Sequence, residues 1–268
     1  MHGGLMMKKM FSLEDRVAIV TGGNRGIGKG IARAFAEAGA NIVIGDIAIG
    51  ARNGPGATNT VDEIKTDFGV EALGLKVDVR LEKDNQDMVK KALDAFGRID
   101  ILVCNAGMGG GGIWPQDMEV AKWDEIMETN LRSYFIAARE VYPIMKKGGG
   151  GKIIGIGSVT SLFGVGPFAV YGASKGGVLQ LTRGLAVGWA ADNIQVNCIL
   201  PGWINTDLSV NAKKKDPGLE KRVTARTPAG RWGETADIAG TALFLASRAS
   251  DFVTGVAIPV DGGYSVQG

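Results

Sequence analysis

The sequence has very few of the residues on which metal centres and many catalytic triads depend. It contains one histidine, His2, and two cysteines, Cys104 and Cys198, among 268 residues. This excludes a Cys/His metal cluster and a histidine-based triad. Both cysteines lie in apolar runs that are far apart in the chain. We therefore expect buried free thiols, no bound metal and a location in the reducing cytoplasm.

Long apolar runs and a dominant charge are also missing. The first 11 residues contain neither the apolar core nor the cleavage site of a signal peptide, so residues 1–11 are predicted to be a mobile tail. No run reaches the ~18 apolar residues of a membrane span. The formal net charge of +2 gives no support to a nucleic-acid partner. No Ser/Pro-rich linker divides the chain, and we predict one domain over residues 12–268.

Short apolar segments alternate with longer segments of helical period. The predicted strands are 16–21, 41–46, 73–79, 99–105, 152–158, 193–201 and 256–261, and the predicted helices are 28–39, 82–97, 118–145, 170–191 and 235–247. The strands are apolar throughout rather than alternating, which is typical of parallel strands covered on both faces. The pattern predicts an α/β fold, a doubly wound (Rossmann) seven-stranded parallel sheet with helices on both faces. Ligands of such sheets bind beyond the carboxyl ends of the strands.

A glycine-rich turn, TGGNRGIGKG (21–30), follows the first strand and opens the first helix. The spacing in 23–29 resembles a P-loop, but Gly30 replaces the Ser or Thr that holds magnesium. The strict G-x-G-x-x-G pattern fails because Ile31 occupies its last position. The pattern T-G-x-x-x-G-x-G does fit. This pattern indicates a turn that binds a dinucleotide. The alternative interpretation is a glycine-rich start of a helix that binds no ligand.

This turn resembles that of the short-chain dehydrogenase/reductase family. The resemblance implies a nicotinamide cofactor. The residues that match the family's cofactor-binding positions are Thr21, Gly22, Arg25, Gly26, Ile27, Gly28, Asp46, Asp78, Val79, Asn105, Ala106, Gly107, Tyr171, Lys175, Pro201, Gly202, Ile204 and Thr206. By the same resemblance Asp78 contacts the adenine, and Ile204 and Thr206 contact the nicotinamide carboxamide.

Two residues give opposite indications of the cofactor's form. Asp46 closes the second strand, where a carboxylate accepts hydrogen bonds from ribose hydroxyls and repels a 2′-phosphate. Arg25 is a basic residue of the kind that accompanies NADP in many members of the family. No arginine follows Asp46 directly. We therefore expect NAD, with NADP as the alternative.

Tyr171 and Lys175 stand four residues apart in a predicted helix and so share one face. A free tyrosine, with a pKa of about 10, is a poor base at neutral pH. An ammonium about 4 Å away at an effective dielectric of ~20 favours the phenolate by about 4 kcal/mol. The pair can thus form an acid/base, or it can be an ordinary pair of helix residues.

Ser158, at the end of the fifth strand, and Asn130, in the preceding long helix, match the two other catalytic positions of the family. The resemblance extends from about residue 14 to VDGGY (260–264). It implies that Tyr171 is the general acid/base and that Ser158 binds the substrate oxygen. It also implies that Lys175 binds the nicotinamide ribose and lowers the pKa of Tyr171, while Asn130 supports a proton-relaying water.

The segments expected to face the substrate are 107–115, 159–168 and a polar lid over about 203–231. The lysines and arginines of the lid either attract an anionic substrate or form a solvated helix face. Four aromatic residues either line the pocket or pack beneath it: Trp114, Phe163, Phe168 and Trp203.

Three functions are compatible with these motifs. The first is hydride transfer between a nicotinamide cofactor and a secondary alcohol or ketone, with a sugar, polyol or sugar acid as substrate. The second is an NADP-dependent 3-oxoacyl-[acyl-carrier-protein] reductase, and the third is a nicotinamide-binding regulator without turnover. Members of the family usually pair through the terminal strand and through the helix that follows Tyr171, which here contains Gly176, Gly177, Gly184 and Gly188. The resemblance therefore implies a homotetramer.

Overall fold

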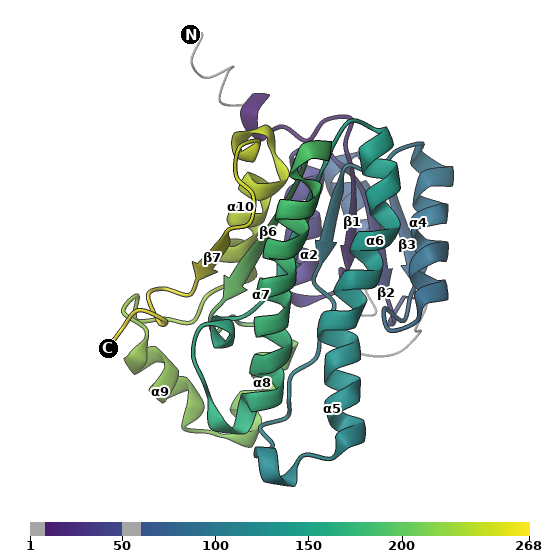
Figure 1. Ribbon diagram of the computed structural model, residues 1–268. Coiled ribbons are helices and arrows are strands. Elements are labelled where there is room, and N and C mark those ends of the chain that lie inside the picture. Colours follow the sequence, from purple (N-terminus) through teal and green to yellow (C-terminus); the bar gives the residue numbers. More distant parts are fainter. Residues whose placement is uncertain (1–8, 50–59) are drawn as a thin grey trace, which may run out of the picture.

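The computed structural model describes residues 9–49 and 60–268, so residues 1–8 of the predicted tail lie outside it. The described residues form one seven-stranded parallel sheet of order β3-β2-β1-β4-β5-β6-β7 (Figure 1). Its strands are β1 (Val17–Thr21), β2 (Asn41–Asp46), β3 (Ala72–Lys76), β4 (Ile101–Cys104), β5 (Gly151–Ile156), β6 (Ile194–Pro201) and β7 (Ala257–Val260). Each overlaps a predicted strand, which confirms the doubly wound fold. The order reverses between β1 and β4, where ligands of such sheets bind.

Helices cover both faces of the sheet. One face carries α2 (Gly26–Glu37), α3 (Thr60–Phe68) and α10 (Thr235–Ala246), and the other carries α4 (Glu82–Phe96), α6 (Ser133–Lys147) and α7 (Ala169–Trp189). No helix of the described ranges is long and apolar enough to cross a membrane.

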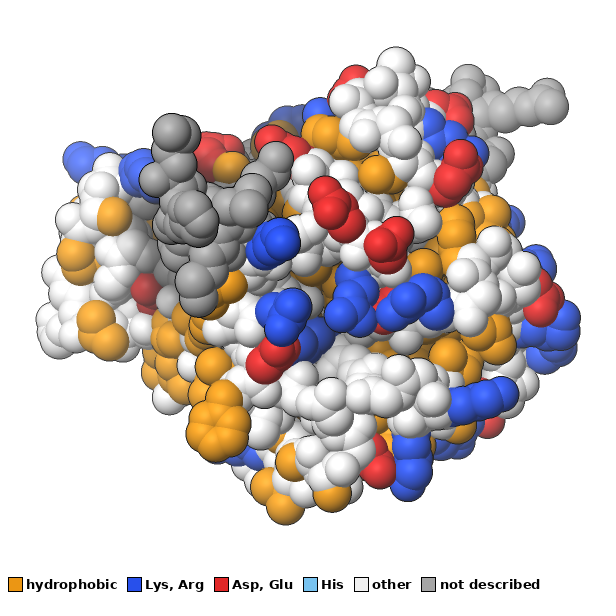
Figure 2. All heavy atoms as spheres, turned by 90° about the horizontal axis from the view of Figure 1, so that it is seen from above, with side chains coloured by type: hydrophobic (Ala, Val, Ile, Leu, Met, Phe, Trp, Pro, Cys, Tyr) orange, Lys and Arg blue, Asp and Glu red, His pale blue; other side chains and the backbone are white. Residues whose placement is uncertain are grey.

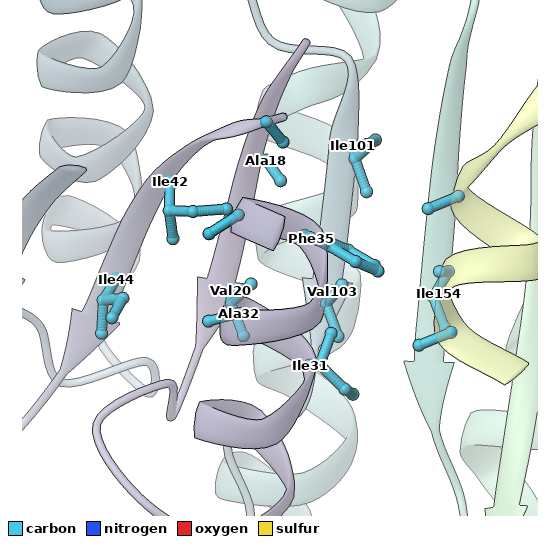
Figure 3. Close-up of a cluster of buried hydrophobic side chains, with 14 of the residues drawn as sticks. Ala18, Val20, Ile31, Ala32, Phe35, Ile42, Ile44, Ile101, Val103 and Ile154 are labelled. Atoms are coloured by element: carbon cyan, nitrogen blue, oxygen red, sulfur yellow. The ribbon is translucent and has the colours of Figure 1, made fainter. Parts of the chain in front are cut away.

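The core on the α2 face shows why these segments fold together. Ile31, Ala32 and Phe35 of α2 recur at helical spacing and are completely buried. They point toward the apolar side chains of β1 and β4, among them Val20 and Val103 (Figure 3). Burying apolar surface at ~25 cal/mol per Å² makes this contact a main source of stability.

The structure differs from the predicted helices in three places. The predicted helix 118–145 is two helices, α5 (Val120–Met127) and α6, joined by a π-helical turn, η2 (Glu128–Arg132). Helix α3 was not predicted, and it is held by Val61 and Ile64 against the sheet. The predicted lid contains α8 (Asp207–Lys215) and α9 (Leu219–Arg226), which have few apolar residues.

The amino-terminal and carboxyl-terminal ends of the strands form two edges of the sheet, and these two edges differ in their surroundings. At the amino-terminal edge, Lys/Arg and Asp/Glu side chains are interspersed (Figure 2). There the buried Asp100 pairs with Arg16 at 2.8 Å and Arg98 at 2.6 Å, and Lys152 pairs with Asp251 at 2.9 Å. Beyond the carboxyl edge lie α5, α8 and α9 (Figure 1). The predicted site residues lie at this second edge.

Candidate active site

The glycine turn between β1 and α2 is shaped by contacts with the end of β4. Nδ2 of Asn105 donates to the carbonyl oxygens of Thr21 at 3.0 Å and Gly22 at 2.9 Å. A Cβ at Gly28 would lie 2.3 Å from the Gly22 oxygen and 2.4 Å from Asn105 Nδ2. Gly22 (φ +64°) and Gly26 (φ +55°) adopt the left-handed conformation that favours glycine. The protein itself therefore requires glycine at position 28.

The first turn of α2 leaves backbone N–H groups available at this edge. Arg25 occupies the N-cap position and makes no capping hydrogen bond through its side chain. The N–H groups of an uncapped helix start, together with the helix dipole, form a favourable site for a phosphate. Thr206 lies opposite, since a Cβ at Gly26 would be 3.5 Å from its Cγ2. The turn thus fits the pyrophosphate of a dinucleotide.

The acidic residues predicted to contact the adenosine are both hydrogen-bonded within the protein. Asp46 is buried, and its two carboxylate oxygens accept the backbone N–H groups of Asn24 at 3.1 Å and Ala48 at 2.9 Å. Asp78 accepts from Arg80 Nη2 at 2.6 Å, and this guanidinium holds the pKa of the Asp78 carboxyl below its ordinary value. Arg25 is exposed and forms no ion pair with any residue that the structure describes.

The other predicted cofactor residues follow the same edge. Ala106 donates its backbone N–H to Thr21 Oγ1 at 3.2 Å. Two of the predicted contact residues are part of the core, since Val79 is 8% and Ile204 is 6% exposed. Ile204 forms a short parallel bridge with Gly233 and lies two residues before Thr206, the N-cap residue of α8. Among the rest, Gly107 and Gly202 border the edge, as do Ile27 and Pro201.

The four predicted catalytic residues converge next to this turn. Nζ of Lys175 donates to the Ile156 carbonyl at 2.8 Å and lies 5.8 Å from the centroid of the Tyr171 ring. Tyr171 is hydrogen-bonded to Ser158, whose side chain is buried. A Cβ at Gly107 would lie 3.2 Å from Asn130 Oδ1 and 3.4 Å from Lys175 Nζ. The end of β5, the π-helical turn η2 and the first turns of α7 thus bring the four residues together beside the loop after β4.

The pKa of Tyr171 differs from the sequence-based expectation. Burial raises it above its ordinary value, and the hydrogen bond with Ser158 opposes the shift only in part. The Lys175 ammonium points to the Ile156 carbonyl, and burial lowers its own pKa to about 8. The lower pKa of Tyr171 that the resemblance implies is therefore not reached, because desolvation dominates.

A buried residue that the motifs did not identify connects this set. Ser174 Oγ donates to the backbone oxygen of Tyr171 at 2.7 Å and accepts from Asn130 Nδ2 at 3.0 Å. The Asn130 side chain also bonds the backbone N–H and carbonyl of Met108, at 2.8 and 3.0 Å. The spacing Tyr-x-x-Ser within α7 could have indicated this role, because residues three apart share a helix face.

Lys213 of α8 is one of the residues that hold the predicted lid in place. Lys213 of α8 donates to Asn205 Oδ1 at 3.0 Å and to Glu220 of α9 at 2.8 Å. Its Nζ also lies 4.1 Å from the centroid of the Trp232 ring. Trp232 in turn packs edge-on against Trp203, with 5.3 Å between the ring centroids. These contacts hold both lid helices against the loop after β6.

Comparisons with known proteins match nearly the whole chain. Residues 22–265 match the family model described as enoyl-(acyl carrier protein) reductase. The chain is 38% identical over 263 residues to a 2-dehydro-3-deoxy-D-gluconate 5-dehydrogenase of Dickeya dadantii, covering 97% of this chain and 99% of the relative.

Solved structures agree with this result. A protein of Sinorhizobium meliloti described as a short-chain alcohol dehydrogenase is 39% identical, with a TM-score of 0.88 and coverage of 96% of this chain and 99% of the other. A protein of Beutenbergia cavernae described as an NAD(P)-dependent gluconate 5-dehydrogenase, with NADP bound, is 34% identical, with a TM-score of 0.87 and coverage of 96% and 99%. The chain belongs to the short-chain dehydrogenase/reductase family and is an NAD(P)-dependent oxidoreductase of secondary alcohols and ketones.

Proposed function

We propose that residues 12–268 form one catalytic domain that oxidises a secondary hydroxyl group of a sugar, polyol or sugar acid with NAD. The observation that supports this most directly is the convergence of Ser158, Tyr171 and Lys175 beside the glycine turn. The relative from Dickeya dadantii is described as acting on a sugar acid, which supports this substrate class.

Tyr171 is the proposed general base. In the oxidising direction its phenolate takes the hydroxyl proton of the substrate as hydride leaves the neighbouring carbon. The nicotinamide, when bound, supplies the hydride acceptor. Ser158 is hydrogen-bonded to Tyr171, so an oxygen that reaches the tyrosine also reaches the serine hydroxyl. Ser158 then orients the substrate oxygen toward the base.

The proposed role of Lys175 is to supply positive charge beside the tyrosine. Burial alone keeps Tyr171 protonated at neutral pH, so the phenolate needs stabilisation by neighbouring charge. With a pKa of about 8, Lys175 is mostly charged at pH 7. Its remaining ammonium protons are available to ribose hydroxyls, while Asn130 fixes the loop at Met108 and supports the relay water.

The preference for NAD is proposed on the basis of Asp46. Its carboxylate is anchored by two backbone N–H groups at the end of β2 and cannot turn away from a phosphate group. The NADP in the Beutenbergia cavernae protein favours the other form. Arg25, which is exposed, is the residue that would attract the 2′-phosphate if that form prevails.

Replacing the proposed base tests the function. Tyr171→Phe is expected to abolish turnover of polyols and sugar acids while the dissociation constants for NADH and NADPH stay within about twofold. Tyr142→Phe is the matched control, because this α6 hydroxyl donates to Asp192 at 2.7 Å and does not belong to the proposed site. An active Tyr171→Phe enzyme would contradict the assignment.

The acyl-thioester alternative keeps one supporting observation, the description of the matching family model as enoyl-(acyl carrier protein) reductase. The same purified enzyme can be assayed with NADPH and a 3-oxoacyl thioester. Reduction of the thioester at a higher kcat/KM than that of any keto sugar acid would favour this second function.

We also propose that the enzyme is a cytoplasmic homotetramer. Both cysteines are free, as expected in a reducing compartment. Phe135 of α6 and Val187 of α7 are 45% and 85% exposed on the outer helix layer, which a second copy could cover. Mass measurement in solution decides the assembly, and a monomer would refute it.

A further inference from the structure

One large aromatic side chain beside the proposed site is partly in water. Trp114 belongs to the loop after β4 and is 53% exposed, whereas Trp232 beneath the lid is 5% exposed. A half-exposed indole presents apolar surface that a ligand can cover. The sequence left open whether this tryptophan lines the pocket or packs beneath it.

The position of the indole is fixed by a glycine in the segment between Ser158 and Tyr171. A Cβ at Gly166 would lie 2.6 Å from Cζ3 and 3.1 Å from Cη2 of Trp114. Gly166 does not have the positive φ that would itself demand glycine. The close approach of the indole therefore explains the glycine at this position, and any side chain there would displace Trp114.

Two further close approaches locate this loop relative to Tyr171. A Cβ at Gly110 would be 3.2 Å from the Cβ of Tyr171, and one at Gly112 would be 4.0 Å from Cζ of Phe168. Gly166 and Phe168 form the short helix η4 (Gly166–Phe168), which leads directly into α7 and Tyr171. The loop therefore lies along the tyrosine segment, with the indole against η4.

We propose that Trp114 is a specificity-determining residue that packs against the carbon face of a substrate whose hydroxyl group is held at Tyr171. The inference rests on the proposed function and names the substrate class more closely. The favoured substrate carries a ring or a carbon chain beyond the reacting carbon, with C–H groups on one face. A minimal alcohol does not reach the indole and gains nothing from it.

Two neutral secondary alcohols, cyclohexanol and isopropanol, test the proposal. Trp114→Ala is expected to lower kcat/KM for cyclohexanol by about tenfold or more, because each apolar group in a pocket changes discrimination by ~10-fold to 200-fold. The value for isopropanol should change by less than about twofold. Trp123→Ala, which removes another exposed indole from α5, should leave the ratio of the two values unchanged.

Gly166→Ala gives an independent test with the tryptophan in place. Its methyl group pushes the indole aside and should reproduce the loss on cyclohexanol. In the double variant Trp114→Ala/Gly166→Ala the methyl meets no indole, so the two effects should not add. Additive losses, or equal losses on both alcohols, would overturn the proposal. A different oligomeric state of Trp114→Ala in solution would also overturn it, because the indole would then be covered by a second copy of the chain.

A readout without turnover separates this inference from the proposed function. The proposed function is judged by its own test on polyols and sugar acids, so it can fail while the contact with Trp114 holds, or hold while the contact fails. If the wild-type enzyme oxidises neither alcohol, the contact is measured by binding. Saturation-transfer NMR then measures the binding of cyclohexanol to the wild type and to Trp114→Ala in the presence of NADH, without any turnover. Equal saturation in both proteins would refute the contact, and a clear loss in the variant would support it.

Discussion

Asp46→Asn is the substitution that tests cofactor choice most directly. The wild-type carboxylate accepts hydrogen bonds from Asn24 N–H at 3.1 Å and Ala48 N–H at 2.9 Å. An amide keeps the shape and loses the charge, but one of the two N–H groups then faces an NH₂ donor. We expect a loss of about 1.5–3 kcal/mol in the free energy of unfolding, which is typical of a lost hydrogen bond to a charged group.

The effect on cofactor preference follows from the same charge. A 2′-phosphate with about two negative charges at ~5 Å from a carboxylate is repelled by about 1.5 kcal/mol at the dielectric of water and by about 6 kcal/mol at an effective dielectric of ~20. Asp46 is only 7% exposed, so the value lies between these limits. Even the lower limit predicts that the ratio of the NADPH to the NADH dissociation constant falls by about tenfold or more.

Tryptophan fluorescence titration with each reduced cofactor at physiological salt measures this ratio. Asp78→Asn is the control, because Asp78 pairs with Arg80 and should affect both cofactors equally. Urea unfolding of each variant shows whether it remains folded. The reasoning is refuted if folded Asp46→Asn keeps the wild-type ratio, or if the wild type already binds NADPH more tightly.

Three further predictions concern the buried lysine, the turn and the lid. In the folded protein the pKa of Lys175 is about 8, below its ordinary value of 10.5. Between these two pH values the unfolded chain binds more protons than the folded protein, so the free energy of unfolding of the wild type should rise with pH, by up to about 3 kcal/mol. Urea unfolding at pH 8 and pH 9.5 should show this rise in wild type and not in Lys175→Met. Gly28→Ala should lower the free energy of unfolding by about 2 kcal/mol or more, because the new methyl group clashes with the backbone of Gly22. Gly26→Ala should lower it by only about 1 kcal/mol and should mainly weaken cofactor binding. Similar unfolding midpoints of the two variants would argue against this reasoning. Lys213→Met should speed amide hydrogen exchange in α8 and α9 about 5-fold to 30-fold by removing two hydrogen bonds, and unchanged exchange would show that the lid does not depend on this lysine.

The sheet could be predicted from sequence because its strands are short apolar runs, as in Ile42–Ile44 and Leu102–Val103, whose burial is imposed by helices on both faces. The lid helices could not. Helices α8 and α9 are polar, and contacts such as that of Lys213 with Trp232 hold them, which no local pattern reports. The break at Asn130 was missed for another reason. The segment Glu128–Arg132 contains no Pro or Gly that would mark an interruption of the helix.

The site shows the same division. Motif spacing was sufficient to select Ser158, Tyr171 and Lys175, because strand ends and helix faces follow from chain order. The direction of the Tyr171 pKa shift was not predictable. It depends mainly on burial, which arises only when the elements around Tyr171 pack together. The link through Ser174 likewise requires the π-helical turn η2, which contains Asn130, to meet α7.

The hydrogen bonds from Asn105 to the turn have a kinetic consequence. They hold the cradle for the phosphates in its final shape before any ligand arrives, so the entropy of ordering that loop is lost during folding and not during binding. Association should then be fast, with little rearrangement of the turn. We expect the slower event to be a movement of α8, because its N-cap residue Thr206 lies against Gly26 of the turn. An enzyme that must exchange its cofactor in every cycle would have its turnover limited by the opening of this helix.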